Sequence, residues 1–129
     1  MNEPESKTRF RLRKEQKLRS PAEFDRVYAT KQKAGDDRLL IFAAVNETRV
    51  TRFGLSVSRK HGGAVRRARL KRLMRESFRL HQHDLPPGLD LVLIPRQGVT
   101  ANVHQFADSL LRLTRRLGRR LGTQEDTEP

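Results

Sequence analysis

The residues best suited to chemistry lie in one cationic stretch, residues 59–79, which reads RKHGGAVRRARLKRLMRESFR. The stretch holds nine cations and one acid, Glu76, so it supplies +8 of the net charge of +13. Arginine accounts for 21 of the chain's 28 cations, and its planar guanidinium group pairs bidentately with phosphate and stacks on bases. This pattern favours binding of a polyanion, above all a nucleic acid.

A helix is expected over residues 64–82, and on a helical wheel it separates into two sides. The apolar side collects Leu70, Leu73, Met74, Ser77 and Phe78. The opposite side collects Arg69, Lys71, Arg72, Arg75 and Arg79. A solvated surface is the ordinary interpretation of such a charged side, but here like charges repel at i, i+3 and i+4 spacing. A phosphate-bearing partner would relieve that repulsion, so we expect the helix to pack by its apolar side and present its cations outward.

Three residues before this helix, His61, Gly62 and Gly63, could form a phosphate cradle. Glycine lets the backbone approach a ligand closely, and a helix N-terminus favours anions. A glycine pair is by itself a weak signal, because most such pairs are turns.

Groups that could make the protein itself a nuclease are scattered along the chain. Such chemistry needs clustered carboxylates for metal ions, or a histidine acting as acid and base. Asp36 and Asp37 are the only adjacent acids outside the C-terminal tail, and Arg38 follows them. His81 and His83 are two residues apart, so they would not share a helix face. We therefore expect no catalytic side chain and no metal site in the protein.

The length of 129 residues and the 35% hydrophobic content fit one domain with a modest core. We expect this domain over residues 9–121, between a disordered N-terminal tail (1–8) and a disordered acidic tail (122–129). No apolar run is long enough for a bilayer, and the N-terminus has no apolar signal segment. Cysteine is absent, which is compatible with a reducing compartment. We expect a cytoplasmic protein with no membrane partner.

Turn signals and periodicity order the remaining elements. Ser20 and Glu23 form a capping box that opens a helix ending near Thr30, and Asn102 with Gln105 opens another that runs to about Leu121. Strands are expected over residues 39–45, 53–57 and 89–94. We expect the first two strands to pair as an antiparallel hairpin. The second and third, joined by the basic helix, would lie parallel in one sheet.

The cationic stretch resembles the signature of the bacterial ribonuclease P protein family, which is roughly K-K-x-G-x-A-V-x-R-N-R-x-K-R-x-x-R-E-x-x-R. The matching positions are Arg59, Lys60, Gly62, Ala64, Val65, Arg67, Arg69, Lys71, Arg72, Arg75, Glu76 and Arg79. Similarity extends to residues 24–28, 53–58 and 90–96, and spans roughly residues 12–117. Ala68 departs from the family's usual Asn, and His61 stands where an apolar residue is more usual.

This resemblance implies an α+β fold, a small two-layer α/β sandwich in which helices pack on a four-stranded sheet. The order would be α-β-β-β-α-β-α, with an additional short strand near residues 30–34. The resemblance also implies a left-handed crossover around the basic helix, although physical priors favour a right-handed one.

The function that the resemblance implies is that of an accessory subunit whose RNA partner is the catalyst. The protein would bind that catalytic RNA and the 5′ leader of precursor tRNA, and would assist endonucleolytic removal of the leader. Mg²⁺ would be required by the RNA and not bound by the protein alone, and we expect one protein per RNA. The residues implied for the catalytic RNA are Arg59, Lys60, Arg66, Arg67, Arg69, Lys71, Arg72, Arg75 and Arg79. Those implied for the leader are Phe24, Tyr28, Gly54, Ser56 and Ser58.

The leader residues fit single-stranded RNA because aromatic rings stack on bases without regard to sequence. Gly54, Ser56 and Ser58 would form a flat floor on the second strand of the hairpin. Phe24 has an equally plausible interpretation as a core residue, whereas we expect Tyr28 to face the surface.

Two non-enzymatic alternatives remain. A ribosomal or other structured-RNA-binding protein would have the same composition, and only the signature separates it from the family that the chain resembles. A DNA-binding helix module is less well supported, because the sequence has no helix-turn-helix pattern and its charge is spread over several elements.

Overall fold

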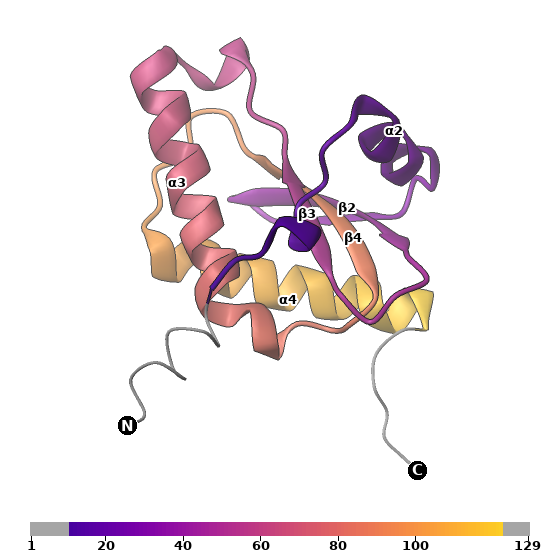
Figure 1. Ribbon diagram of the computed structural model, residues 1–129. Coiled ribbons are helices and arrows are strands. Elements are labelled where there is room, and N and C mark those ends of the chain that lie inside the picture. The colour runs from indigo at the N-terminus through magenta and orange to yellow at the C-terminus, as the bar shows by residue number, and fades with distance from the viewer. Residues whose placement is uncertain (1–10, 123–129) are drawn as a thin grey trace.

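The computed structural model describes residues 11–122, which form three helices, four strands and three short 3-10 turns (Figure 1). The helices are α2 (Pro21–Ala29), α3 (Ala64–His81) and α4 (Val103–Leu121). The strands are β1 (Lys33–Gly35), β2 (Leu39–Val45), β3 (Arg52–Leu55) and β4 (Leu89–Pro95). The 3-10 turns are η1 (Lys14–Gln16), η2 (Arg59–His61) and η3 (Gln82–Asp84). The expected N-terminal tail (1–8) lies outside the described residues, and so does the expected C-terminal tail (122–129) except for Gly122, which caps α4.

The expected α+β class and the order α-β-β-β-α-β-α are confirmed. Both capping boxes form: Ser20 Oγ accepts from the Glu23 amide, and Asn102 Oδ1 accepts from the Gln105 amide. Gly122 ends α4 in the left-handed region, at φ +75°. The helices therefore begin and end where local sequence signals place them.

The sheet has the order β1-β2-β4-β3, so the expected hairpin between residues 39–45 and 53–57 is wrong. β4 lies between these two strands, antiparallel to β2 and parallel to β3. Six of its seven residues are buried, and a strand buried on both faces gains most from a central position. The expected parallel pairing across the α3 connection is confirmed. The handedness of that connection stays an expectation from the family resemblance.

β3 also ends earlier than expected, at Leu55. The Ser56 amide still donates to the Leu93 carbonyl, but Ser58 lies beyond the sheet. Its hydroxyl accepts from the Lys60 amide and caps η2. Ser58 therefore does not belong to the floor that the sequence pattern indicated.

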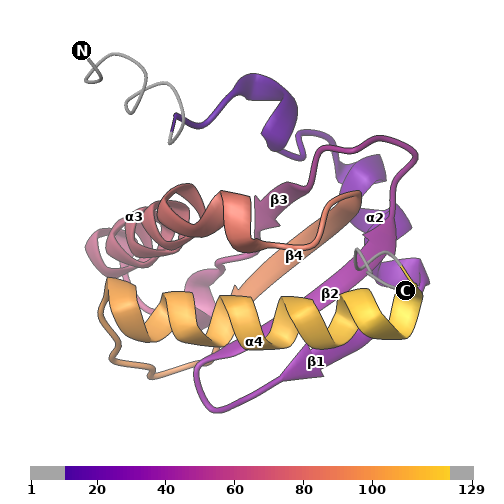
Figure 2. The ribbon, with the colours of Figure 1, turned by 90° about the horizontal axis from the view of Figure 1, so that it is seen from below.

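The main core lies between one face of the sheet and the helices α3 and α4 (Figures 1 and 2). Strand residues of alternating position, such as Ile41 and Leu91, meet helix residues such as Leu113 there. Phe53 of β3 stacks on Phe78 of α3 with ring centroids 4.2 Å apart. This contact fixes α3 along the β3 side of the sheet.

The opposite face of the sheet is covered at one end by α2, with Leu18 of the preceding segment buried in the same cluster (Figure 1). Val27 is fully buried there against Ala44 and Val92. Phe24 and Tyr28 of the same helix are only partly buried. One short helix cannot cover a four-stranded sheet, so this face keeps partly exposed apolar residues.

Candidate nucleic-acid interface

α3 packs by the side that the sequence indicated. Leu70, Met74, Ser77 and Phe78 are buried, and Leu73 packs against the same core. The Ser77 hydroxyl contacts the Leu73 and Val103 carbonyls at 2.9 and 3.0 Å, so the only polar group on this side is satisfied. The opposite side of α3 is therefore held outward.

We use "the cationic face of α3" for Arg69, Lys71, Arg72 and Arg75. Arg69, Arg72 and Arg75 are exposed, and Lys71 is half-buried. Within residues 11–122, none of the four makes an ion pair or a hydrogen bond through its side chain. Four unpaired cations on one helix retain their full capacity to bind phosphate.

The other three cations that were expected on α3 have intramolecular partners. Arg79 forms an ion pair with Glu76, with Nη2 and Oε2 2.6 Å apart, and this hydrogen bond lowers the pKa of Glu76. Arg66 donates to the carbonyls of His61 and Val99. Arg67 donates to the Gly62 carbonyl at 3.1 Å. The contacts of Arg66 and Arg67 tie the start of α3 to the segments before it and after β4, and the Arg79–Glu76 pair lies within the last turns of α3. These three side chains therefore have a structural role.

The turn before α3 presents Arg59 and Lys60 to solvent but turns His61 inward. The buried His61 ring accepts from the Ser58 amide at Nδ1, 3.0 Å away, so its Nε2 is the nitrogen that donates to the Pro95 carbonyl at 2.7 Å. His61 therefore belongs to the support of the turn and not to a phosphate cradle. Gly62 has φ +119°, a conformation that side-chain-bearing residues rarely adopt.

Phe24 of α2 lies directly on Gly54 of β3. A Cβ atom on Gly54 would come within 2.4 Å of the Phe24 ring, so only glycine allows this approach. Gly54 is buried under the ring and is not an open floor, which corrects the expectation from the sequence. Tyr28 packs edge-on against Phe42 of β2, with centroids 5.1 Å apart. Both α2 aromatics are thus half in the core and half on the surface.

A surface groove, which we call the α2–α3 groove, runs between residues 11–19 (the N-terminal arm), α2, β3 and α3. It is lined by Lys17, Leu18, Arg19, Phe24, Phe53, Gly54, Leu55, Lys71 and Arg75. The structure therefore brings two residues of the expected leader set, Phe24 and Gly54, to the same groove as two cations of α3. Tyr28, Ser56 and Ser58 do not line it.

The arm supplies a wall of this groove that the sequence did not reveal. The Leu18 amide donates to the Phe53 carbonyl, and Gln16 donates to Gln82 at the end of α3. Lys17 and Arg19 flank the buried Leu18, and both are exposed. The cation–apolar–cation alternation at positions 17–19 was the one available signal.

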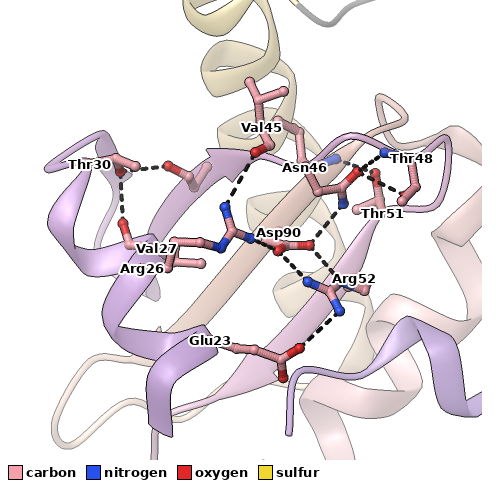
Figure 3. Close-up of polar contacts among 12 residues, drawn as sticks. Glu23, Arg26, Val27, Thr30, Val45, Asn46, Thr48, Thr51, Arg52 and Asp90 are labelled. Carbon is pink, nitrogen blue, oxygen red and sulfur yellow. Dashed lines mark hydrogen bonds and ion pairs between the residues drawn. The ribbon is translucent and has the colours of Figure 1, made fainter. Parts of the chain in front are cut away.

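A buried charge network holds α2 over the sheet (Figure 3). Asp90 of β4 is fully buried and accepts from Arg52 at 2.6 and 2.8 Å, from Asn46 at 2.8 Å and from Arg26 of α2. Arg52 also pairs with Glu23 of α2 at 3.1 Å. The hydrogen bond to Asp90 raises the pKa of Arg52. Glu23 and Arg26 are both on α2, so the network fixes the position of this helix and of Phe24 and Tyr28 on it.

Comparison with known families decides between the alternatives. The family model described as Ribonuclease P matches residues 12–118. The chain belongs to the ribonuclease P protein family.

Curated ribonuclease P protein components match over most of their length. The component from Yersinia enterocolitica is 44% identical over 87 residues, which cover 67% of this chain and 72% of that protein. The component from Cronobacter sakazakii is 38% identical over 105 residues, which cover 80% and 87%.

Solved ribonuclease P proteins share the fold. The Thermotoga maritima protein matches with a TM-score of 0.71 and 30% identity, over 78% of this chain and 96% of that one. The Staphylococcus aureus protein matches with a TM-score of 0.67 and 29% identity, over 78% and 93%.

Two further features of this ribonuclease P protein can be stated for the described part of the chain. Residues 11–122 contain no group of three or more histidine or acidic side chains that could hold a metal ion. None of their helices is both long and apolar enough to cross a membrane.

Proposed function

We propose that this chain binds the catalytic RNA of ribonuclease P and the 5′ leader of precursor tRNA, and thereby assists RNA-catalysed removal of the leader. The observation that carries the proposal is the α2–α3 groove, where unpaired Lys71 and Arg75 face the half-exposed ring of Phe24. Proteins that bind single-stranded RNA usually combine cations that contact the phosphate backbone with aromatic rings that stack on the bases.

The cationic face of α3, together with Arg59 and Lys60 of η2, supplies the contacts to the catalytic RNA in this proposal. These side chains are free to pair with phosphates, whereas Arg66, Arg67 and Arg79 support the helix from within. Phosphate contacts of this kind position a protein on RNA without reading its sequence.

The leader would lie over Phe24, Tyr28 and Ser56, while Gly54 would act by letting the Phe24 ring lie directly on β3. Phe24 and Tyr28 keep part of each ring exposed, so a base can stack on them. Ser56 extends the same face of the sheet beyond Phe24 and Gly54. Ser58, which caps η2, would act only by holding that turn.

The protein contributes no reacting group in this proposal. Bond cleavage belongs to the RNA, and the magnesium ions that it needs are held by the RNA. We expect one protein per RNA, in the cytoplasm.

Reconstitution tests the proposal. Purified chain is added to a bacterial ribonuclease P RNA at low magnesium, and cleavage of precursor tRNA is followed. We expect the chain to accelerate release of the leader at magnesium concentrations where the RNA alone is slow. Tight binding to ribosomal RNA without any acceleration would contradict the proposal and support the structured-RNA-binding alternative.

A further inference from the structure

An apolar spot lies beside the cations at the start of α3. Val65 is 86% exposed, and the only other large hydrophobic residue exposed among residues 11–122 is Val45, at 44%. Ala64 and Ala68 are exposed as well, and no atom outside the neighbouring residues lies within 4 Å of a Cβ built on Gly63. Ala64, Val65 and Ala68 therefore form a small, uncharged and open spot beside the half-buried Arg66 and Arg67.

Helical spacing places this spot on the same side as the unpaired cations. Ala68 and Arg69 are three and four residues after Val65, and Arg72 is seven residues after it, so they form one strip. η2, with exposed Arg59 and Lys60, precedes the strip. The apolar spot is thus bracketed by cations along the chain.

Single exposed hydrophobic residues are common on protein surfaces, so the exposure of Val65 does not by itself indicate a binding site. Val65, however, is β-branched, which gives it low helix propensity, and it receives no burial in return. Arg69 and Arg72, on the same strip, have no partner among the described residues either, whereas Arg66 and Arg67 donate to backbone carbonyls. Val65 is thus exposed on the same strip as two cations that lack a partner within the described chain. One external partner could contact all three side chains.

We infer that Val65 and Ala68 form a contact for an unpaired nucleobase of the catalytic RNA. A base face is apolar and flat, and the phosphates on either side of it carry the charge that Arg69 and Arg72 on one side, and Lys60 on the other, can bind. An acidic protein segment is disfavoured, because a nucleotide carries a flat apolar base beside its phosphate, whereas an acidic side chain offers only the charge. The inference rests on the proposed function and adds a base contact to its phosphate contacts.

The test is the substitution Val65→Thr, which keeps the side-chain shape and replaces one methyl group by a hydroxyl. Affinity of the full chain for ribonuclease P RNA is measured over a series of salt concentrations. We expect affinity to fall about fourfold, as for one methyl group lost from an apolar contact, with an unchanged salt slope. The matched control is Val45→Thr, at the end of β2 that pairs with Leu89, far from the α3 start beside Pro95; it should leave affinity unchanged.

A second readout locates the base. In chemical probing of the complex, a nucleotide protected by the wild-type protein should become reactive with Val65→Thr and stay protected with Val45→Thr. Unchanged affinity with Val65→Thr, or a salt slope reduced as for a lost phosphate contact, would overturn the inference while leaving the proposed function intact. Failure of the wild-type chain to prefer this RNA over ribosomal RNA would instead overturn the proposed function.

Discussion

Some charged side chains in this protein have hydrogen-bond partners within the chain, and others have none among the described residues. Asp90 is fully buried and accepts four hydrogen bonds, two from Arg52 and one each from Arg26 and Asn46. Buried charges persist only with such compensation. The cationic face of α3 has no partner of this kind within the described chain. The first group holds the structure together, and the second is available for a ligand.

Thr114 of α4 is an exception inside the core. It is fully buried, and its hydroxyl has no hydrogen-bond partner within residues 11–122. Because an unsatisfied buried hydroxyl is costly, we expect Thr114→Val to raise the free energy of unfolding by about 1 kcal/mol in urea denaturation. Thr30→Val is the control, since the Thr30 hydroxyl lies 2.7 and 2.8 Å from two carbonyls and its loss should destabilise. Destabilisation of similar size by both variants would contradict this account of Thr114.

Tyr28 offers a test of the leader contact at the level of one residue. Its ring packs on Phe42 but remains partly exposed, so it can stack on a leader base. Tyr28→Ala should weaken binding of precursor tRNA to the reconstituted enzyme by about 1–3 kcal/mol, the usual worth of one stacked base. Mature tRNA lacks the leader and serves as the control ligand. Equal losses for both RNAs would exclude a specific leader contact.

At the level of elements, the sequence predicted the helix boundaries, which depend on nearby residues, and missed the strand order, which depends on distant ones. Caps and periodicity placed α2 and α4, because Ser20 with Glu23 and Asn102 with Gln105 act within one turn. Strand pairing depends on distant segments, so the neighbouring runs 39–45 and 53–57 were wrongly paired with each other. The strong apolar character of β4 was the signal that it belongs between them.

The candidate site shows the same division. The cationic face of α3 followed from helical spacing alone. The alternation at positions 17–19 does not indicate which elements the N-terminal arm contacts, so its place beside β3 and α3 could not be derived from the sequence. The cover of Phe24 over Gly54 also depends on how α2 crosses the sheet.

The turn between β1 and β2 is tied to α4 through Asp36. Burial alone would raise the pKa of this carboxyl, but hydrogen bonds from Ser109, from two backbone amides and from Arg112 outweigh burial and hold the pKa at about 2 instead of 3.8. Arg112 Nη2 lies 2.9 Å from Asp36 Oδ2. A lowered folded-state pKa stabilises the fold above about pH 4, and that stabilisation is lost as the pH falls toward 2.

Asp36→Asn should therefore lower the free energy of unfolding by about 1–2 kcal/mol at pH 6. The difference from wild type should shrink when denaturation is repeated near pH 2.5. Asp37→Asn is the matched control, because Asp37 is adjacent and exposed. A difference that stays constant from pH 6 to pH 2.5 would exclude the ionised carboxyl as its cause.

At the scale of the whole molecule, the cations differ in how far contacts within the protein already occupy them. On α4, Arg112 pairs with Asp36 and Asp108, and Arg115 and Arg120 donate to backbone carbonyls. Arg116 and Arg119 of α4 are exposed and have no partner among the described residues. The α2–α3 groove differs from the surface of α4, because Lys17, Lys71 and Arg75 line it together with the partly exposed ring of Phe24. Single-stranded RNA can therefore bind cations and an aromatic ring together at this groove, although the net charge of +13 would attract a polyanion everywhere.

The most direct test of this account is the salt dependence of binding to ribonuclease P RNA. The variant Arg69→Ala/Arg72→Ala removes two charges from the cationic face of α3, and Arg115→Ala/Arg120→Ala removes two from α4. If α3 is the RNA-binding side, the first variant should weaken binding and reduce the salt slope by about two units, one for each lost phosphate contact. The α4 variant should keep the wild-type slope. An unchanged slope for the α3 variant, or equal reductions for both variants, would contradict the account.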